Sequence, residues 1–286
     1  MTVLEVIQRS AEFLQRKQVE SPRLQAELLL AHVLKMARLK LYLNFERALK
    51  PEEEAAMREL VQRRGKREPL QHLVGSVNFC GYELAVSRDV LIPRPETETL
   101  AELAWTYING LPEGDLRALD LGTGSGCLPI TIALKSPRVA FDTVDISAAA
   151  SALARKNAEK HQLNGRVKFL EGDLFAPLSQ GQRYHLIISN PPYIEAAEIE
   201  TLEPEVKDFD PRVALDGGAD GLEFYHRLAK EGSVWLVAGG RLMAEFGEGQ
   251  GPAIQKIFED HGWAVHGLEK DLSGRERFVI ASVRGA

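Results

Sequence analysis

The hydrophobic pattern of the chain changes character between its N-terminal part and the rest. In the N-terminal part, apolar residues such as Leu4, Ile7 and Ala11 recur three or four positions apart, which predicts amphipathic helices. Further on, short apolar runs alternate with helical stretches, a pattern typical of a layered α/β fold. We therefore expect a small helical domain over residues 1–75 and a larger α/β domain over residues 89–286.

The N-terminal part carries recognisable helix starts and ends. Ser21-Pro22 predicts an N-cap followed by proline at the first helical position. Pro51 is expected to open a third helix, because the three glutamates that follow put negative charge where the helix dipole favours it. The basic run over residues 63–67 suits a helix C-terminus better than a nucleic-acid patch. No pattern in this part indicates chemistry of its own.

Residues 76–88 are predicted to form a β-hairpin that links the two domains, because alternating apolar residues flank Cys80-Gly81. A proline-rich segment then leads into a helix over residues 96–109. Further strands are predicted at residues 116–121, 139–145, 166–171, 184–189, 241–246, 263–268 and 277–283. Further helices are predicted at residues 127–135, 147–161, 221–237 and 252–261.

The first strand of the α/β domain runs into a glycine-rich loop, Asp120-Leu121-Gly122-Thr123-Gly124-Ser125-Gly126. Glycines allow a tight turn and a close approach of the backbone to a ligand at a helix N-terminus. The spacing is GxGxG and not the GxGxxG of dinucleotide-binding loops. Taken alone, this loop could equally be a structural strand–helix turn.

The next three strands also end in residues suited to a ligand. Asp145 ends the second strand, 23 residues beyond Gly122, near the offset of about 20 residues at which a carboxylate binds ribose hydroxyls. Asp173 and Leu174 follow the third strand, and Asn190-Pro191-Pro192-Tyr193 follows the fourth. Open α/β sheets bind ligands at the carboxyl ends of their strands. The four strand ends together therefore indicate a nucleoside-type ligand.

The Asn-Pro-Pro-Tyr turn has unusual backbone properties. Proline fixes its own φ, has no N–H and pushes the preceding residue toward an extended conformation. Asn190 is therefore expected to be extended, and the Asn190 and Pro191 carbonyls meet no competing donor from the prolines. From these four residues alone, a stiff loop and a functional site are equally good interpretations.

Together these residues resemble the class I S-adenosylmethionine-dependent methyltransferases, and the Asn-Pro-Pro-Tyr form resembles those that modify planar nitrogens. Three further stretches are similar to the release factor glutamine methyltransferase family: Glu68–Gly75, Ile92–Glu98 and Asp210–Leu222. The resemblance covers nearly the whole chain. It implies a Rossmann-like seven-stranded sheet and an enzyme that methylates the Gly-Gly-Gln glutamine of peptide chain release factors to N5-methylglutamine, which would modulate translation termination.

The resemblance also implies roles for individual residues. S-adenosylmethionine would be the cofactor and S-adenosylhomocysteine the product. The methionine portion would be held by Gly122, Thr123, Gly124, Ser125 and Gly126. Asp145 would bind the ribose hydroxyls, and Asp173 with Leu174 the adenine. The catalytic residues would be Asn190, Pro191, Pro192 and Tyr193, with Asn190 also touching the cofactor. Residues 1–75 would recognise the substrate.

The chemistry of an amide acceptor suits the turn. An amide nitrogen is a poor nucleophile because its lone pair is delocalised into the carbonyl. The Asn190 side-chain oxygen and the Pro191 carbonyl could each accept a hydrogen bond from the amide NH2 and orient its nitrogen, while Tyr193 covers the amide plane. The sulfonium methyl is already activated, so alignment would supply much of the acceleration. The motif contains no general base, as expected if the proton departs after methylation.

Composition and charge limit the kinds of partner and ligand that we expect the chain to bind. No apolar run approaches the ~20 residues that span a bilayer, and the N-terminus has no secretory signal, so we expect a cytoplasmic protein away from membranes. Cys80 and Cys127 have no metal-ligand spacing, so neither a metal site nor a disulfide framework is expected. The net charge of −6 divides into +4 over residues 1–75 and −10 over the remainder, which argues against general DNA binding.

Three other interpretations stay open. Adenine-N6 or cytosine-N4 methylation of nucleic acid would also use a planar amine, but it requires a basic target surface and usually a base-flipping pocket. A dinucleotide-dependent oxidoreductase is disfavoured by the GxGxG spacing and the Asn-Pro-Pro-Tyr turn. A non-catalytic module that docks on the translation machinery would have no need of Asn190 or of the full glycine loop.

Overall fold

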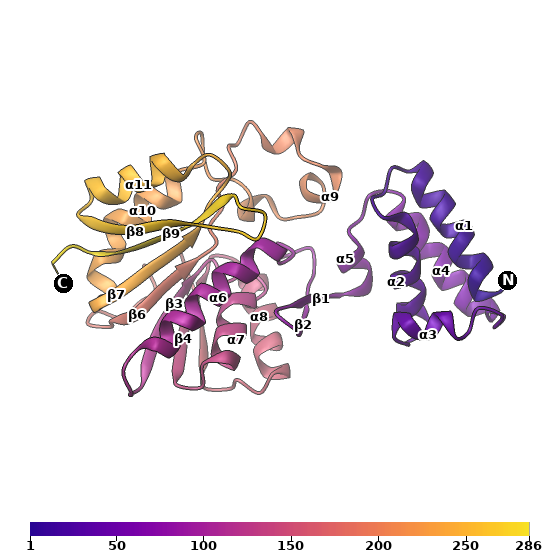
Figure 1. The fold of residues 1–286 in the computed structure, drawn as a ribbon, viewed down its shortest axis with the longest axis horizontal. Coiled ribbons are helices and arrows are strands. Elements are labelled where there is room, and N and C mark those ends of the chain that lie inside the picture. The colour runs from indigo at the N-terminus through magenta and orange to yellow at the C-terminus, as the bar shows by residue number, and fades with distance from the viewer. Residues whose placement is uncertain (286) are drawn as a thin grey trace. The chain divides into compact units, whose positions relative to one another are not determined.

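A computed structural model describes residues 1–285, which form two compact units (Figure 1). One unit comprises residues 1–76 together with residues 203–209. The other comprises residues 77–202 and the chain from residue 210 onward. None of the helices in the described chain reaches the length and hydrophobicity that crossing a bilayer requires.

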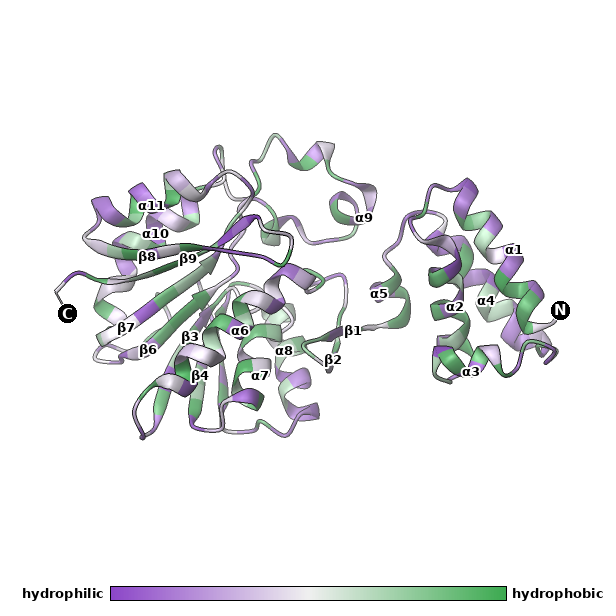
Figure 2. Cartoon of the chain, in the orientation of Figure 1, coloured by the Kyte–Doolittle hydropathy of each residue, from purple (hydrophilic) through white to green (hydrophobic). Residues whose placement is uncertain are grey.

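The N-terminal unit is helical, as the apolar spacing predicts. Its helices are α1 Val3–Arg16, α2 Pro22–Val33, α3 Arg38–Tyr42, α4 Pro51–Arg64 and α5 Leu70–Val74. They enclose one apolar core, and Figure 2 shows hydrophobic and hydrophilic residues alternating along each helix as amphipathic packing requires. The α1 helix begins with a capping box in which the Thr2 hydroxyl accepts from Glu5 N and the Glu5 carboxylate accepts from Thr2 N.

The predicted cap at Ser21 is only partly correct. Pro22 is the first residue of α2, as expected. Ser21, however, has a left-handed backbone (φ 47°, ψ 51°), and its side chain makes no cap hydrogen bond. An N-cap side chain reaches the N–H groups of the first turn from an extended backbone, which Ser21 does not adopt. The short helices α3 and α5 were not predicted, because five residues are too few to display a helical period.

Segment 203–209, which contains α9 Pro204–Lys207, belongs to the helical unit through ion pairs. The Arg64 guanidinium donates to Glu205 Oε1 at 2.7 Å, and Arg67 donates to Glu205 Oε1 at 2.6 Å. Arg67 also reaches Glu203 Oε2 at 2.7 Å. The basic residues at the end of α4 thus serve a structural role within this unit, and the role of residues 1–75 in substrate recognition stays a prediction.

The predicted hairpin is present as β1 Ser76–Phe79 and β2 Tyr82–Ala85. Cys80 and Gly81 form its turn with positive φ of 50° and 86°, the combination that a two-residue turn between twisted strands favours. Phe79 and Leu84 are buried in the core of the second unit. The hairpin is therefore part of that core as well as a connection.

The second unit is built on a seven-stranded sheet within the described chain, as predicted. Its strands are β3 Leu116–Leu121, β4 Val139–Asp145, β5 Val167–Glu171, β6 Tyr184–Ser189, β7 Leu236–Glu245, β8 Trp263–Lys270 and β9 Glu276–Val283. The order is β5-β4-β3-β6-β7-β9-β8. Neighbours from β5 to β7 are parallel, whereas β9 is antiparallel to β7 and β8.

Helices cover both faces of this sheet (Figure 1). One face packs against α6 Pro95–Gly110, α7 Cys127–Lys135 and α8 Ala148–Lys160, and the other against α10 Glu223–Glu231 and α11 Gly251–Asp260. Successive strand residues alternate between the two cores, so that Ala118 belongs to the first and Leu119 to the second. This is why the central strands read as continuous apolar runs.

One boundary was predicted wrongly. The helix expected over residues 221–237 ends at Glu231, a 3₁₀ turn covers Gly232–Trp235, and β7 begins at Leu236 instead of residue 241. The run Val234-Trp235-Leu236-Val237 is apolar throughout, and a short apolar run does not distinguish buried strand from buried helix. The other strands and helices predicted for this unit lie within one or two residues of their observed bounds.

The chain reverses its direction of travel across the sheet between β3 and β6, which are neighbours. The chain passes from β3 outward to β4 and β5, then returns to β6 and continues to β7 on the other side. Such a switch point leaves a crevice at the carboxyl ends of the two central strands, where open α/β sheets bind their ligands. The glycine loop follows β3, and the Asn-Pro-Pro-Tyr turn follows β6.

Candidate active site

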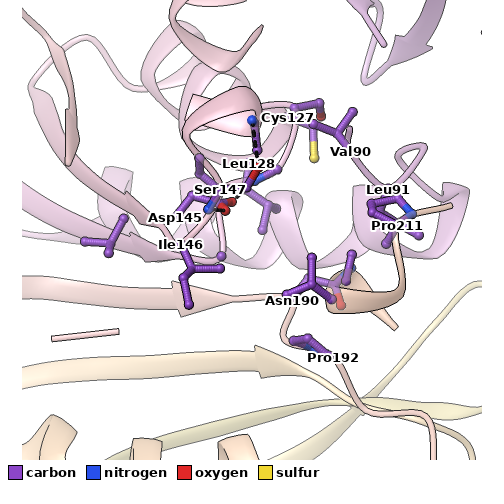
Figure 3. Close-up of a pocket in the computed structure, with 18 of the residues that line it drawn as sticks. Val90, Leu91, Cys127, Leu128, Asp145, Ile146, Ser147, Asn190, Pro192 and Pro211 are labelled. Atoms are coloured by element: carbon purple, nitrogen blue, oxygen red, sulfur yellow. Dashed lines mark hydrogen bonds between the residues drawn. The ribbon is translucent and has the colours of Figure 1, made fainter. Parts of the chain in front are cut away.

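A pocket with an empty volume of about 1050 Å³, including its open mouth, lies at the carboxyl ends of the parallel strands. Figure 3 shows Asp145, Ile146 and Ser147 on one side of it and Asn190 and Pro192 on another. Each of the first four strands, β3 to β6, contributes residues that follow its last position. A pocket of this size suits a ligand as large as a nucleoside with an extended substituent.

The glycine loop forms one wall of the pocket. Gly122 and Gly124 have φ of 78° and 53°, and a Cβ added at either would meet no atom within 4 Å. Their missing side chains therefore open onto free space and not onto packed protein. Thr123 and Ser125 are buried, and neither hydroxyl has a hydrogen-bond partner within the described chain. The loop thus presents bare backbone to a ligand, whereas the two buried hydroxyls lie beside protein groups, Thr123 beside the Asp120 carboxyl and Ser125 beside the Cys127 thiol.

Gly126 has a different role, because a Cβ there would lie 2.9 Å from Ile130 Cδ1 and 3.1 Å from Ala154 Cβ. Glycine at this position lets the start of α7 pack closely against α8. Of the three loop glycines, Gly122 and Gly124 face the pocket, while Gly126 serves helix packing.

Asp145 is held rigidly at the end of β4. Its Oδ2 accepts from Gly124 N and its Oδ1 from Ser147 N, each at 2.8 Å. Burial raises the pKa of this carboxyl, and the two backbone N–H groups oppose the rise. A carboxylate has about four acceptor positions, so each oxygen keeps capacity for a ligand hydroxyl pair.

Asp173 and Leu174 line the pocket beyond β5. The Arg227 guanidinium of α10 donates to both Asp173 carboxylate oxygens at 2.9 Å. Leu174 has a left-handed backbone with φ of 47°, which costs a non-glycine residue roughly 1–2 kcal/mol. The side chain of Leu174 is buried, and its packing in the apolar core compensates for this strain.

The turn after β6 divides its residues between pocket and core. Asn190 and Pro192 line the pocket. Pro191 is buried, and the Tyr193 ring packs against the apolar core on the α10–α11 face of the sheet. Neither Pro191 nor Tyr193 is among the pocket-lining residues of the described chain. The predicted position of the Tyr193 ring over an acceptor therefore has no counterpart in this geometry.

Two buried side chains anchor the turn from behind. Asn190 Nδ2 donates to Thr97 Oγ1 at 3.2 Å, and Thr97 Oγ1 donates to Glu245 Oε2 at 2.7 Å. The Tyr193 hydroxyl donates to Glu245 Oε1 at 3.3 Å. Thr97 lies in the first turn of α6 and Glu245 is the last residue of β7, so three elements meet at this point.

The backbone of the turn is also held by the glycine-rich segment around residues 216–221. Ile194 N donates to Leu215 O at 3.0 Å, and Gly217 N donates to Ile194 O at 2.8 Å. A Cβ on Gly217 would lie 2.8 Å from Tyr193 Cα, and one on Gly221 would collide with the Tyr193 carbonyl oxygen. Only glycine permits so close an approach of two backbones.

An ion pair between a partly exposed arginine and a buried carboxylate closes another side of the pocket. Arg94 Nη2 donates to Asp210 Oδ2 at 2.6 Å, and the Asp210 side chain is fully buried. Burial raises the pKa of Asp210 to about 6, against the lowering effect of the Arg94 charge. Arg94 and Pro211 both line the pocket, so this pair ties the segment after residue 210 to the entry of α6.

Asp120 is the least satisfied polar group near the site. It is 1% exposed, and neither carboxylate oxygen has a hydrogen-bond partner within the described chain. Burial raises the pKa of Asp120 to about 7 against the lowering effect of the adjacent Thr123 hydroxyl, and the Asp145 charge adds to the rise. Burial also raises the pKa of the nearby Cys127 thiol to about 12, which makes it a poor nucleophile.

Among residues 1–285, no group of three His, Cys, Asp or Glu side chains could hold a metal ion.

Comparison with known proteins identifies the family. The model of the PrmC N-terminal domain matches residues 5–75, and that of the methyltransferase small domain matches residues 106–204. A release factor glutamine methyltransferase of Geobacter sulfurreducens is 43% identical over 278 residues, which cover 97% of this chain and 95% of that protein. The chain belongs to the release factor glutamine methyltransferase family. The family member of Deinococcus radiodurans is 38% identical, with 100% of both chains covered.

A solved structure supports the fold. The human methyltransferase 10 domain containing protein is 16% identical, with a TM-score of 0.52 over 71% of this chain and 88% of that one. This similarity concerns the fold alone. With the seven-stranded sheet and the family membership, the predicted class I methyltransferase fold is confirmed.

The fold of this family member brings most of the predicted site residues into one pocket. Those that line it are Gly122, Thr123, Gly124, Ser125, Asp145, Asp173, Leu174, Asn190 and Pro192. Sequence reasoning missed Thr97, Glu245, Arg94 and Arg227. Glu245 could have been found by the criterion that selected Asp145, because it ends a parallel strand at the same edge of the sheet.

Proposed function

We propose that this chain transfers the methyl group of S-adenosylmethionine to the side-chain amide nitrogen of the Gly-Gly-Gln glutamine in peptide chain release factors. One observation carries the proposal. The Asn190 amide, whose NH2 is bound to Thr97, lies in the same pocket as the glycine loop and Asp145. In the described part of the chain no hydrogen bond reaches Asn190 Oδ1, so this oxygen is available to an acceptor amide.

The fit of S-adenosylmethionine rests on the pocket walls. Gly122 and Gly124 leave open space where side chains would project, so the backbone groups of the loop are open to a ligand. These groups suit the methionine portion. Asp145 would accept hydrogen bonds from the ribose hydroxyls, and the backbone around Asp173 and Leu174 would bind the adenine. The placement of these residues around one pocket supports the assignment.

The sulfonium would supply an activated methyl group when bound, so the protein has to orient the acceptor amide and exclude water. Asn190 Oδ1 would accept one hydrogen bond from the glutamine NH2, and the Pro191 carbonyl would accept the other, in line with the donor inventory of an amide. This orientation turns the nitrogen lone pair toward the methyl carbon. The N–C bond forms as the C–S bond breaks, S-adenosylhomocysteine leaves, and one proton departs from the nitrogen, which has become acidic.

No side chain in the turn has to remove that proton. Burial raises the pKa of Tyr193 well above its usual value, with the Glu245 charge adding to the rise, so its phenol stays neutral. Tyr193 and Glu245 bind each other behind the pocket and do not line it. Their positions support a structural function for both groups and release of the proton to water through the pocket mouth.

We also propose that residues 1–75 recognise the folded release factor. The charge of +4 on these residues, against −10 on the remainder, supports an acidic partner surface. A peptide containing only the Gly-Gly-Gln loop lacks that surface. It should be methylated with a much higher KM than the whole factor, and equal KM values for peptide and factor would count against recognition outside the loop.

The relatives lend no support to a nucleic-acid methyltransferase. The proposal is tested by incubating the chain with methyl-labelled S-adenosylmethionine and an unmodified release factor. Label should enter the parent factor and not a factor whose loop glutamine has been replaced. Label that enters the changed factor equally, or enters DNA or RNA instead, would contradict the proposed acceptor.

A further inference from the structure

The hydrogen bonds behind the Asn-Pro-Pro-Tyr turn fix which way the Asn190 amide points as well as where it lies. It runs from Asn190 Nδ2 to Thr97 Oγ1 at 3.2 Å, and from Thr97 Oγ1 to Glu245 Oε2 at 2.7 Å. Thr97 is 1% exposed and Glu245 2% exposed, so solvent does not compete for these bonds. The other Glu245 oxygen accepts from the Tyr193 hydroxyl.

Counting protons fixes the direction of each bond. An ionised carboxylate can only accept hydrogen bonds, and a threonine hydroxyl has a single proton to donate. Thr97 therefore donates to Glu245, and its oxygen is left to accept. The group of Asn190 that faces Thr97 must then be the NH2, and Oδ1 must point away from Thr97. The direction of the Asn190 amide thus follows from the charge on Glu245.

We propose that Thr97 and Glu245 are positioning residues, which make Asn190 present its oxygen, and not its NH2, to the substrate amide. The inference rests on the proposed function, because the direction matters only when the acceptor is an NH2 group. With the Asn190 amide reversed, two NH2 groups would face each other, and only the Pro191 carbonyl would be left to orient the glutamine nitrogen.

The surroundings of Glu245 are consistent with this role. Burial raises its pKa to about 7, while the Thr97 hydrogen bond, the Arg277 charge and the Tyr193 hydrogen bond act in the opposite direction. The carboxylate is ionised above that pH, so the direction of the bonds applies there and the tests below are made at pH 8. The charged and titratable groups that face it are Glu96 of α6, Cys127 of α7, Tyr193 of the turn, Arg277 of β9 and Tyr225 of α10. The Tyr225 hydroxyl donates to the Glu245 carbonyl at 2.6 Å, which fixes the backbone that carries the carboxylate.

The kinetic test replaces the Thr97 hydroxyl and keeps its shape. Thr97→Val should lower kcat for methylation of an unmodified release factor about tenfold, the effect of losing one hydrogen bond that orders the site. Its KM for the factor and its affinity for S-adenosylmethionine should stay near those of the parent. Thr97→Ser, which keeps the hydroxyl, should recover most of the turnover. Thr131→Val is the matched control, because Thr131 is buried in α7 and its hydroxyl has no hydrogen-bond partner among residues 1–285.

A spectroscopic arm tests the direction without any acceptor. In protein with ¹⁵N-labelled asparagine and methyl-labelled threonine, the Asn190 side-chain NH2 protons should show a nuclear Overhauser contact to the Thr97 methyl group. The Asn190 signals are assigned from their loss in Asn190→Asp. This arm remains informative even if the parent chain methylates no release factor, an outcome that would defeat the proposed function alone.

Each outcome decides the inference. A tenfold loss in Thr97→Val, recovery in Thr97→Ser and the NH2–methyl contact support it. Turnover of Thr97→Val within twofold of the parent, or an equal loss in Thr97→Ser and Thr97→Val, would overturn it, since packing and not the hydroxyl would then matter. If Thr97→Val fails to fold, absence of the contact in the parent overturns the inference and its presence supports it.

Discussion

The Arg227 guanidinium binds the Asp173 carboxylate through two parallel hydrogen bonds, one to each oxygen, both at 2.9 Å. Asp173 follows β5 and Arg227 belongs to α10, so this pair connects the two sides of the sheet edge. The fork-shaped guanidinium fixes the plane of the carboxylate, which a single hydrogen bond could not do. Arg227 therefore determines how Asp173 and the adjoining Leu174 are presented to a ligand.

Replacing Arg227 should weaken cofactor binding. In Arg227→Leu the half-exposed Asp173 becomes free to rotate, and we expect the Kd for S-adenosylmethionine to rise about three- to tenfold, the range for one solvent-screened, geometrically defined pair. Isothermal titration measures this directly. Arg183→Leu is the control, because Arg183 is exposed just before the N-terminal end of β6, at the opposite edge of the sheet. Equal Kd values for Arg227→Leu and the parent would show that Arg227 does not contribute to cofactor binding.

Gly217→Ala should damage the catalytic turn with little effect on the cofactor. The new Cβ would lie 2.8 Å from Tyr193 Cα and 2.9 Å from the Pro192 carbonyl oxygen, so the turn has to shift. We expect a loss of about 1–3 kcal/mol in the free energy of unfolding and a tenfold or larger fall in kcat. In Gly110→Ala, the matched control, the new Cβ meets no atom within 4 Å. Unchanged kcat in Gly217→Ala would show that the turn tolerates movement.

Asp120 makes stability depend on pH. Its pKa is raised from an ordinary 3.8 to about 7 in the folded chain, mainly by burial. A carboxyl group whose pKa is higher in the folded chain than in the unfolded chain contributes stability to the fold that is fully present below the unfolded-state pKa. This contribution is lost as the pH rises through the folded-state pKa. Asp120→Asn removes the charge and keeps the shape. Its unfolding free energy relative to the parent should therefore increase between pH 5 and pH 8, by at most about 3 kcal/mol. Urea unfolding at the two pH values measures it, and a difference that does not change with pH would contradict the prediction.

Asp145→Asn should weaken S-adenosylmethionine binding about tenfold or more, because one side-chain NH2 would then face a backbone N–H where an oxygen now accepts. Titration calorimetry provides the Kd. The exposed Asp115, which lies before β3 at the far edge of the sheet, supplies the control Asp115→Asn. A Kd for Asp145→Asn as low as that of the control would exclude the proposed ribose contact.

The sequence predicts the parts of this site that follow from local periodicity. Asp145 and Asn190 could be placed at the sheet edge because each follows an apolar run, and parallel strands end together. The contact between Thr97 and Glu245 could not, because 148 positions separate them and neither stretch indicates that it meets the other. For the same reason the pairing of Arg64 with Glu205 was missed. The position of Tyr193 depends on which face of the turn meets the core, and that is a property of packing.

The most direct test of the account is the location of the transferred methyl group. A release factor with an unmodified Gly-Gly-Gln loop is incubated with the chain and S-adenosylmethionine, digested, and analysed by fragmentation mass spectrometry. We predict one added methyl group on the side-chain nitrogen of the loop glutamine, and none when Asn190→Ala replaces the parent chain. An unmodified glutamine, or a methyl group found at another residue, would contradict it.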